Sequence, residues 1–262
     1  MKKAVSAEVQ KELTSEDATR YRRAAARITY MAQDRADLAS AAKELAKNMA
    51  RPRKGDEVEV KRVIRYLRAK PRAYVEYPWQ DRPIHLNVYT DSDWAGDVAS
   101  RRSTSGGAAQ MGRHTVLHWA RTQSQVALSR GEAELNGSVK GVSEGLGLQR
   151  TAASLGINVS LRILGDSSAA KGIMMRRGAG HIKHLSTKQL WVQELVERKE
   201  IEAVKIKRQV NLADCCTHHW QATEGGATFE SYWIEVESAV RGGVLRIAPL
   251  FLGDGPLVMD IR

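Results

Sequence analysis

The 262-residue sequence has few cysteines and no long apolar run, and each absence excludes a class of protein. Its two cysteines, Cys215 and Cys216, are adjacent, and neighbouring cysteines rarely pair, so no disulfide framework is expected. No window approaches the ~18 consecutive apolar residues of a membrane-spanning helix. Lys2 and Lys3 are not followed by an apolar stretch of signal-peptide length. We therefore expect an intracellular protein, in the cytoplasm or the nucleus, that does not enter a membrane.

Acidic residues are outnumbered by basic ones, which points to a polyanionic partner. The chain has 41 Lys and Arg against 30 Asp and Glu, a formal net charge of +11. This excess favours nucleic acid over a membrane surface, while the alternative is a basic protein whose charge only keeps it soluble. The hydrophobic fraction of 42% and the charged fraction of 27% are typical of a folded globular chain. Motifs must therefore decide between the two interpretations of the charge.

Residues from Ser15 to about Lys70 have helical periodicity and predict three helices. We expect the first to be capped by Ser15, because Glu16 and Asp17 after it suit the positive end of a helix. The third, preceded by Pro52 and Gly55, has an apolar face and a basic face. The apolar face comprises Val60, Val63, Ile64 and Leu67, and the basic face comprises Lys61, Arg62, Arg65 and Arg68.

Between Pro71 and Pro83 the helical period gives way to prolines, aromatic residues and short alternating segments. We place the main boundary there. It separates a helical segment (1–73) from a central domain (74–220), which a C-terminal extension without an interpretable motif (221–262) follows.

The central domain alternates strand and helix patterns. HLNVYTD and VSLRILGD are strands with period-two alternation, and they end in the acids Asp91 and Asp166. TSGGAAQM, TVLHWA and IEAVKIK supply three further strands. Helices are expected over about 130–155, 169–177 and 187–198, and a short one after Asn211. This order predicts an α/β fold in which helices flank a mixed five-stranded sheet.

Six phrases, in order, carry a resemblance to a known family: YTDSDWAGD, RRSTSGG, ALSRGEAEL, ILGDSSAA, HIKHLSTKQLW and VNLADCCTH. Together they resemble the ribonuclease H domain of copia-type LTR retrotransposons, over about Tyr74 to Trp220. The helical stretch before them resembles the segment that joins reverse transcriptase to that domain. The resemblance implies a ribonuclease H-like fold, cleavage of the RNA strand of RNA/DNA hybrids, and partners that include reverse transcriptase and other parts of a retroelement polyprotein.

In that family four carboxylates hold two divalent metal ions, and the chemistry explains why. Phosphodiester hydrolysis needs a hydroxide near neutral pH and stabilised charge on the attacking and leaving oxygens, which two ions about 4 Å apart supply. Mg²⁺ takes hard oxygen ligands, with Mn²⁺ as an alternative. The resemblance assigns both catalysis and metal binding to Asp91, Glu134, Asp166 and Asp214.

Local reasoning separates some of these acids from their neighbours. Ser129 and Glu132 fit an S-x-x-E capping box, which leaves Glu134 free to project. Ser138, Gly141 and Gly145 are small enough to let that helix approach the sheet. Asp93 lies two residues after Asp91 and stays a second candidate, although a turn role fits it better.

The last two family acids lie at the end of a strand and at the start of a helix, and the residue that follows the first of them leaves the metal ligand intact. Asp166 is followed by Ser167, where asparagine is common in the family. Asp214 opens a final short helix, and an ordinary N-terminal helix acid is the alternative reading.

A basic and hydroxyl-rich stretch is the expected phosphate contact. It comprises Arg101, Arg102, Ser103, Thr104 and Ser105, with a plain basic hairpin as the alternative. Hybrid recognition would then depend on backbone charge, groove shape and the 2'-hydroxyl, with little base specificity. Trp94 and Trp119 are expected in the core.

Two other functions stay open at this point. One is a catalytically inactive, nucleic-acid-binding relic of the same domain, and the other is an integrase-like nuclease on the same general fold. His184 is expected to be structural or to contact the hybrid. A zinc site is disfavoured, because adjacent cysteines cannot easily give spaced ligand pairs. Its candidate ligands are Cys215, Cys216, His218 and His219.

Overall fold

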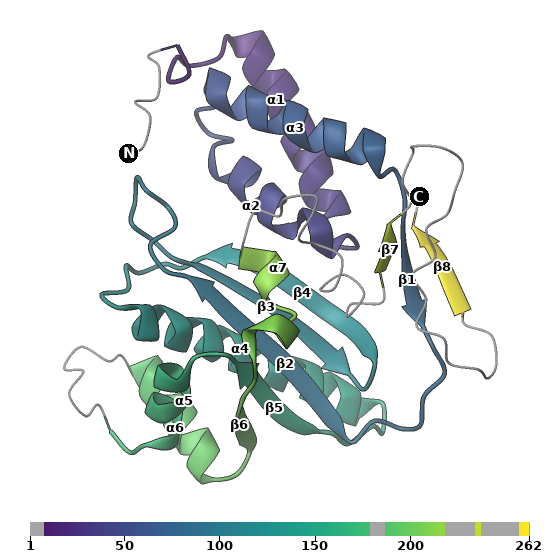
Figure 1. Ribbon diagram of the computed structural model, residues 1–262, viewed down its shortest axis with the longest axis vertical. Helices are drawn as coiled ribbons and strands as arrows, with labels where there is room; N and C mark the ends of the chain where they lie inside the picture. The colour runs from purple at the N-terminus through teal and green to yellow at the C-terminus, as the bar shows by residue number, and fades with distance from the viewer. Residues whose placement is uncertain (1–7, 179–186, 218–233, 237–256, 262) are drawn as a thin grey trace.

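The computed structural model describes residues 8–178, 187–217, 234–236 and 257–261, around a five-stranded mixed sheet (Figure 1). The strand order is β4-β3-β2-β5-β6. The strands are β2 (His85–Asp93), β3 (Thr104–Met111), β4 (His114–Thr122), β5 (Ser160–Gly165) and β6 (Ile201–Lys205). Strands β2 to β4 form an antiparallel meander, while β5 is parallel to β2 and to β6. The predicted mixed five-stranded sheet is confirmed, although β2 runs on past Asp91 to Asp93, which is a strand residue and not a turn residue.

One face of the sheet is covered by α4 (Arg130–Ser154), with α5 (Ser168–Met175) and α6 (Thr187–Glu197) packed beside it. Leu86 and Val88 point to this face by strand alternation and are fully buried in a core cluster that Leu135 and Val142 of α4 share. The burial of these four side chains fixes α4 across the middle of the sheet.

Glycines let α4 lie close to the strands. A Cβ added to Gly141 would come within 2.4 Å of the Thr90 Cγ2 atom, and one added to Gly145 within 2.6 Å of a Leu161 methyl carbon. The predicted close approach at Gly141 and Gly145 is thus confirmed. Gly137 belongs to the same row, since its Cβ would lie 2.7 Å from Ser92 Oγ.

The opposite face of the sheet is covered by elements from distant parts of the chain. They are η1 (Ala36–Leu38), α2 (Ala39–Lys47), β1 (Ala73–Tyr77) and α7 (Asp214–Thr217), which η2 (Arg208–Val210) precedes. Ala36, Ala108, Leu212 and Cys216 are all buried in one cluster there. The helical segment therefore shares a core with the sheet domain.

The helical segment contains the three predicted helices, α1 (Ser15–Met31), α2 and α3 (Lys54–Ala69). Their own core includes Tyr21, Ala25, Ile28, Leu45 and Val60. Three details differ from the sequence prediction. The cap of α1 is Thr14, whose hydroxyl accepts from the Asp17 N–H, because Ser15 is already helical. Gly55 lies in the first turn of α3, and Ile64 is 43% exposed.

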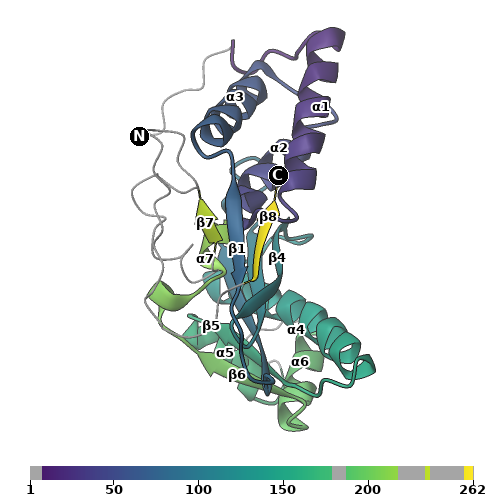
Figure 2. The same cartoon turned by 90° about the vertical axis from the view of Figure 1, so that its right-hand side faces the viewer.

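Strand β1 does not join the main sheet. It pairs antiparallel with β7 (Ile234–Val236) and β8 (Leu257–Ile261), and Figure 2 shows the three strands side by side. Part of the chain after residue 221 thus contributes to a second, three-stranded sheet that was not predicted from the sequence. The boundaries at residues 73 and 220 stay predictions. Among the described helices, none has both the length and the apolar character needed to cross a bilayer.

Candidate metal centre

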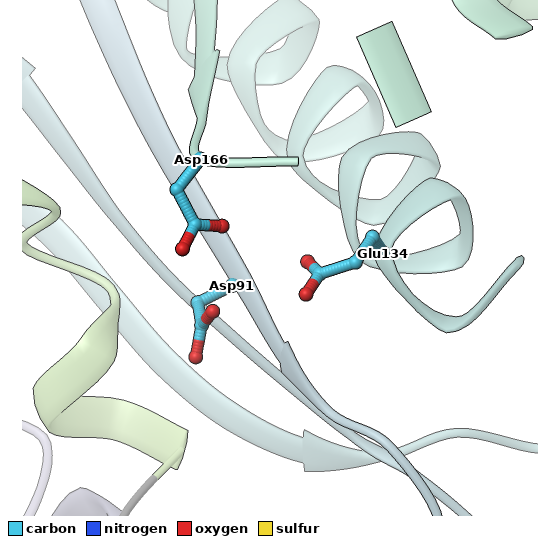
Figure 3. A group of neighbouring side chains, drawn as sticks. All are labelled: Asp91, Glu134 and Asp166. Atoms are coloured by element: carbon cyan, nitrogen blue, oxygen red, sulfur yellow. The ribbon is translucent and has the colours of Figure 1, made fainter. Parts of the chain in front are cut away.

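Asp91 and Asp166 meet because of the register between two parallel strands. The pairing of β2 with β5 sets Tyr89 opposite Leu164, so the positions two residues further along are Asp91 and Asp166. Both strands run in the same direction, and their carboxyl ends reach the same edge of the sheet. The two acids therefore lie next to each other just beyond the last paired residues of β2 and β5 (Figure 3).

Glu134 reaches the same place from α4. It lies one turn into the helix, and Figure 3 shows its carboxylate directed toward Asp91 and Asp166. Carboxylate oxygens of the three residues lie within 4.8 Å of one another. Asp91 and Glu134 are each 4% exposed, whereas Asp166 is partly exposed. Three of the four predicted acids are thus brought together.

The neighbouring Glu132 has the separate, structural role that the sequence predicted. Its backbone N–H donates to Ser129 Oγ at 3.2 Å, which makes Ser129 the cap of α4. Its own carboxylate accepts from the Leu128 N–H at 2.8 Å, one residue earlier than the Ser129 N–H of a standard capping box. Glu132 therefore secures the start of the helix and leaves Glu134 as the acid of the cluster.

The cluster is electrostatically strained. Burial, followed by the charges of Asp91 and Asp166, raises the pKa of Glu134 to about 8. Its Oε1 atom is buried without a hydrogen-bond partner among the described residues. Arg130 Nε lies 3.8 Å from that oxygen, which is an ion-pair distance but too long for a hydrogen bond. A buried carboxylate oxygen in this state is suited to a cation that the three acids would share.

Helix α7 and Asn211, three residues before it, supply further contacts around the cluster. Thr217 Oγ1 donates to the Asp91 carboxylate, and Asn211 Nδ2 donates to the Thr90 carbonyl at 3.0 Å. The Asn211 Oδ1 atom also accepts from the Ala213 N–H at 3.2 Å. These bonds fix α7 against β2 beside the cluster. Thr217 was not predicted, because a single threonine in a short helix gives no local signal of a contact 126 residues away.

The buried side-chain amide of Gln123 holds α4 against the strands. Gln123 Nε2 donates to Ser105 Oγ and to the Ala133 carbonyl, each at 2.9 Å, and Ser92 Oγ donates to the same carbonyl at 2.8 Å. The Ser92 N–H donates to the Glu134 carboxylate. Sequence reasoning missed Ser92 and Gln123 for the same reason as Thr217, since their partners come from three separate elements.

Asp214 stands apart from the other three predicted acids. It opens α7, and its Oδ1 accepts from Arg208 Nη2 at 3.3 Å. Its carboxylate is not among those that lie within 4.8 Å of one another. Its role as a fourth ligand stays a prediction.

The predicted phosphate-contact stretch divides into two parts. Arg101 and Arg102 are exposed. The hydroxyl residues are buried and have partners inside the protein, so phosphate contact at these positions does not fit the structure. Ser103 Oγ accepts from the Ala95 N–H, Thr104 Oγ1 from Lys43, and Ser105 Oγ from Gln123. The hydroxyl pattern in the sequence did not reveal that this stretch turns inward into β3.

Other predicted residues have mixed outcomes. Trp119 is in the core, but Trp94 is 47% exposed, and its indole N–H donates to the Ala127 carbonyl at 3.1 Å. Cys215 and Cys216 are buried thiols, and neither belongs to a potential metal-binding group among the described residues. His184, His218 and His219 lie outside the described residues.

A mixed sheet of this strand order, with acids near the carboxyl ends of β2 and β5 and a third on the covering helix, defines a fold of the ribonuclease H type. No protein-family model matches the chain. The Pol polyprotein from transposon TNT 1-94 of Nicotiana tabacum is 28% identical over 185 residues, 70% of this chain and 14% of the polyprotein. Our chain is a homologue of retrotransposon Pol polyproteins, as the sequence predicted, and spans about one seventh of that relative.

Two further similarities complete the comparison. A protein described as secreted RxLR effector protein 161, from Plasmopara viticola, is 38% identical over 104 residues, 40% of this chain and 72% of its own length. Among solved structures, the ribonuclease H1 called LC11, isolated from compost, overlaps 51% of this chain and 92% of its own, with 15% identity and a TM-score of 0.37. At that score the fold assignment depends on the strand order and not on the overlap.

Proposed function

We propose that this chain hydrolyses the RNA strand of RNA/DNA hybrids in a reaction that depends on divalent metal ions, as part of a retroelement polyprotein. The observation that carries the proposal is the cluster of Asp91, Glu134 and Asp166, with carboxylate oxygens within 4.8 Å of one another. Homology to Pol polyproteins supports the same reaction class. Reverse transcriptase is then the natural partner, and the cytoplasm or nucleus the natural setting.

The residues of the cluster fit a hard divalent cation. All three ligands offer carboxylate oxygens, which Mg²⁺ prefers and Mn²⁺ accepts. The unpartnered Oε1 of Glu134 and the raised pKa of that residue indicate negative charge in excess of what the protein compensates. Asp91, Glu134 and Asp166 would hold the metal, and Asp214 is the candidate for a ligand at a second position. When bound, two such ions activate a water and stabilise charge on the attacking and leaving oxygens.

The surrounding side chains have supporting roles. Thr217 orients the Asp91 carboxylate through its hydrogen bond, and the Ser92 N–H holds Glu134. Arg101 and Arg102 are exposed on the loop after β2, where they can pair with backbone phosphates. Contacts of this kind select the form of the duplex and not its base sequence.

Hydrolysis of a labelled RNA/DNA hybrid tests the proposal against its main alternative, a binding relic. We expect Mg²⁺-dependent cleavage of the RNA strand, with single-stranded RNA and duplex DNA left intact. Asp166→Asn should reduce cleavage by about a hundredfold or more while hybrid binding persists, because it removes one ligand and keeps the side-chain shape. Asp81→Asn, which changes the same charge in an exposed position outside the cluster, is the matched control. If the unmodified chain binds the hybrid but does not cleave it, the alternative of a catalytically inactive, nucleic-acid-binding relic is established.

A further inference from the structure

The loop between β2 and β3, residues 94–103, is folded around the side chain and backbone of Asp97. The Asp97 carbonyl accepts from the Arg101 N–H at 2.7 Å, and the Asp97 N–H donates to the Arg102 carbonyl at 3.2 Å. Its carboxylate accepts from the Ala99 N–H at 3.2 Å and from the Ser100 hydroxyl. Asp97 therefore determines the path of the loop and the place of its two arginines.

Two residues of this loop have a backbone conformation that needs support. Ala95 has φ 54° and Arg101 has φ 58°, both in the left-handed region, although neither is glycine. Such a conformation is disfavoured by about 1 kcal/mol for a residue with a Cβ, so it persists only where surrounding contacts hold it. Arg101 and Arg102 are exposed and have no ion pair with another described residue. Their position is set by the loop alone.

The helical segment supplies a contact that holds this loop from outside. Lys47, at the end of α2, places its Nζ 2.6 Å from Asp97 Oδ1, and the Asp97 side chain is only 12% exposed. One turn earlier on the same helix, Lys43 Nζ donates to Thr104 Oγ1 at 2.8 Å, where β3 begins. Although burial opposes ionisation, the Lys47 and Ser100 hydrogen bonds lower the pKa of Asp97 to about 2. The Asp97 carboxylate is thus ionised at neutral pH and can pair with Lys47.

The loop begins close to the carboxylate cluster of Asp91, Glu134 and Asp166. It leaves β2 after Asp93, two residues beyond Asp91, which corresponds to about 7 Å along an extended strand. Its other end returns at Thr104, which pairs with Asp93. A phosphate within reach of the cluster is therefore also near the loop that carries Arg101 and Arg102.

We propose that Lys47 and Asp97 form a latch, through which the helical segment positions Arg101 and Arg102 to bind phosphates of the nucleic-acid substrate. The latch rests on the proposed function, since it gives Lys47 a role in hybrid binding and none in bond cleavage. Lys47 is a positioning residue that acts through Asp97. The retroelement segment upstream of the nuclease domain would thereby contribute to substrate affinity without touching the substrate at this point.

Steady-state cleavage of the hybrid by Lys47→Gln tests the latch. The loop should lose its preferred conformation, so KM should rise by about fivefold while kcat stays within about twofold, because the carboxylates are unchanged. Lys47→Arg keeps the charge and should restore most of the affinity. Lys140→Gln is the matched control, since it removes the same charge and a similarly exposed ion pair with Glu144 on α4, away from the loop. Equal KM values for Lys47→Gln and Lys140→Gln would overturn the latch.

Limited proteolysis gives a readout that does not need activity. Trypsin cuts after arginine, and we expect Lys47→Gln to speed cleavage after Arg101 and Arg102 several-fold, measured by mass spectrometry of the fragments, with Lys47→Arg and Lys140→Gln close to the unmodified chain. If the unmodified chain cleaves no hybrid, the proposed function fails. The proteolysis still tests whether the Lys47–Asp97 latch holds the loop. An unchanged cleavage rate at these two arginines in Lys47→Gln would refute it.

Discussion

Thr217 Oγ1 donates a hydrogen bond to Asp91 Oδ2, and so connects α7 to the first acid of the cluster across 126 residues. Both residues are buried, with Asp91 4% and Thr217 5% exposed. A hydrogen bond to a charged, buried acceptor is among the stronger ones in proteins. The position of α7 therefore bears directly on the orientation of the Asp91 carboxylate.

Thr217→Val tests this connection, because valine keeps the shape of threonine and removes the donor. We expect kcat/KM for hybrid cleavage to fall by about tenfold, which corresponds to about 1.4 kcal/mol, while the fold is retained. Thr217→Ser should keep most of the activity. Thr151→Val is the control, since the Thr151 hydroxyl bonds to the Gly147 carbonyl on the exposed side of α4. A loss of the same size in Thr151→Val would show that the effect is not specific to Asp91.

Glu134 should make the stability of the metal-free protein depend on pH. Its pKa is raised from 4.5 to about 8, so the folded state binds the proton more tightly than the unfolded state does. The stability linked to this proton is complete below pH 4.5 and is lost as the pH rises toward 8, by an amount on the order of a few kcal/mol. Glu134→Gln removes the titrating group. In the presence of a metal chelator, the melting temperature of the unmodified chain should fall relative to that of Glu134→Gln as the pH rises from 4.5 to about 8.

Glu132→Gln separates this effect from damage to the helix. The Glu132 carboxylate caps the start of α4 through the Leu128 N–H, and its loss should lower stability by about 1 kcal/mol without changing the pH dependence. Glu134→Gln should abolish cleavage, and Glu132→Gln should retain it. If the melting temperatures of Glu134→Gln and of the unmodified chain change with pH in the same way between pH 4.5 and about 8, the raised pKa of Glu134 is contradicted.

Substitution by alanine should have opposite effects on stability at two glycines of α4, Gly141 and Gly147. A Cβ at Gly141 would lie 2.4 Å from Thr90 Cγ2, whereas one at Gly147 would meet nothing within 4 Å. Gly147→Ala should raise the free energy of unfolding by about 0.5–1 kcal/mol through helix propensity. Gly141→Ala should lower it by about 1–2 kcal/mol, because the helix must move away from the sheet. Urea denaturation measures both, and a stabilising Gly141→Ala would show that α4 has room to shift.

The elements with strong periodicity were predictable from the sequence. The alternation in β2 and β5 predicted two strands that end in acids, and the S-x-x-E box distinguished Glu132 from Glu134. Local patterns of this kind depend on neighbours a few residues apart, which the sequence displays directly.

Contacts between distant segments were not predictable in this way. Nothing in AYVEY indicates that β1 pairs with β7 and β8 and not with the main sheet. The burial of Ser103 and Thr104 depends on Ala95, Lys43 and the register of β3, which no single stretch encodes. Thr217 and Gln123 belong to the site only because the fold brings their partners to them.

Asp214 provides the sharpest test of how many acids would bind a metal ion. The clustered acids are Asp91, Glu134 and Asp166, whereas the Asp214 carboxylate pairs with Arg208 at 3.3 Å. Millimolar Mg²⁺ should raise the melting temperature of the unmodified chain, because a cation that binds only the folded state stabilises it. Asp166→Asn should remove most of this shift. Asp214→Asn should keep most of it, since the first ion needs only the clustered acids.

Cleavage by Asp214→Asn should nevertheless fall, because a second ion would lose a ligand, yet by less than in Asp166→Asn. Arg208→Gln is the companion variant: it removes the ion pair between Arg208 and Asp214 without removing a carboxylate, and should leave the Mg²⁺ shift unchanged. The measurement is the melting temperature of each variant over a series of Mg²⁺ concentrations, beside its rate of hybrid cleavage. If Asp214→Asn loses the Mg²⁺ shift as completely as Asp166→Asn does, Asp214 closes onto the first ion and α7 must move toward the cluster when metal binds.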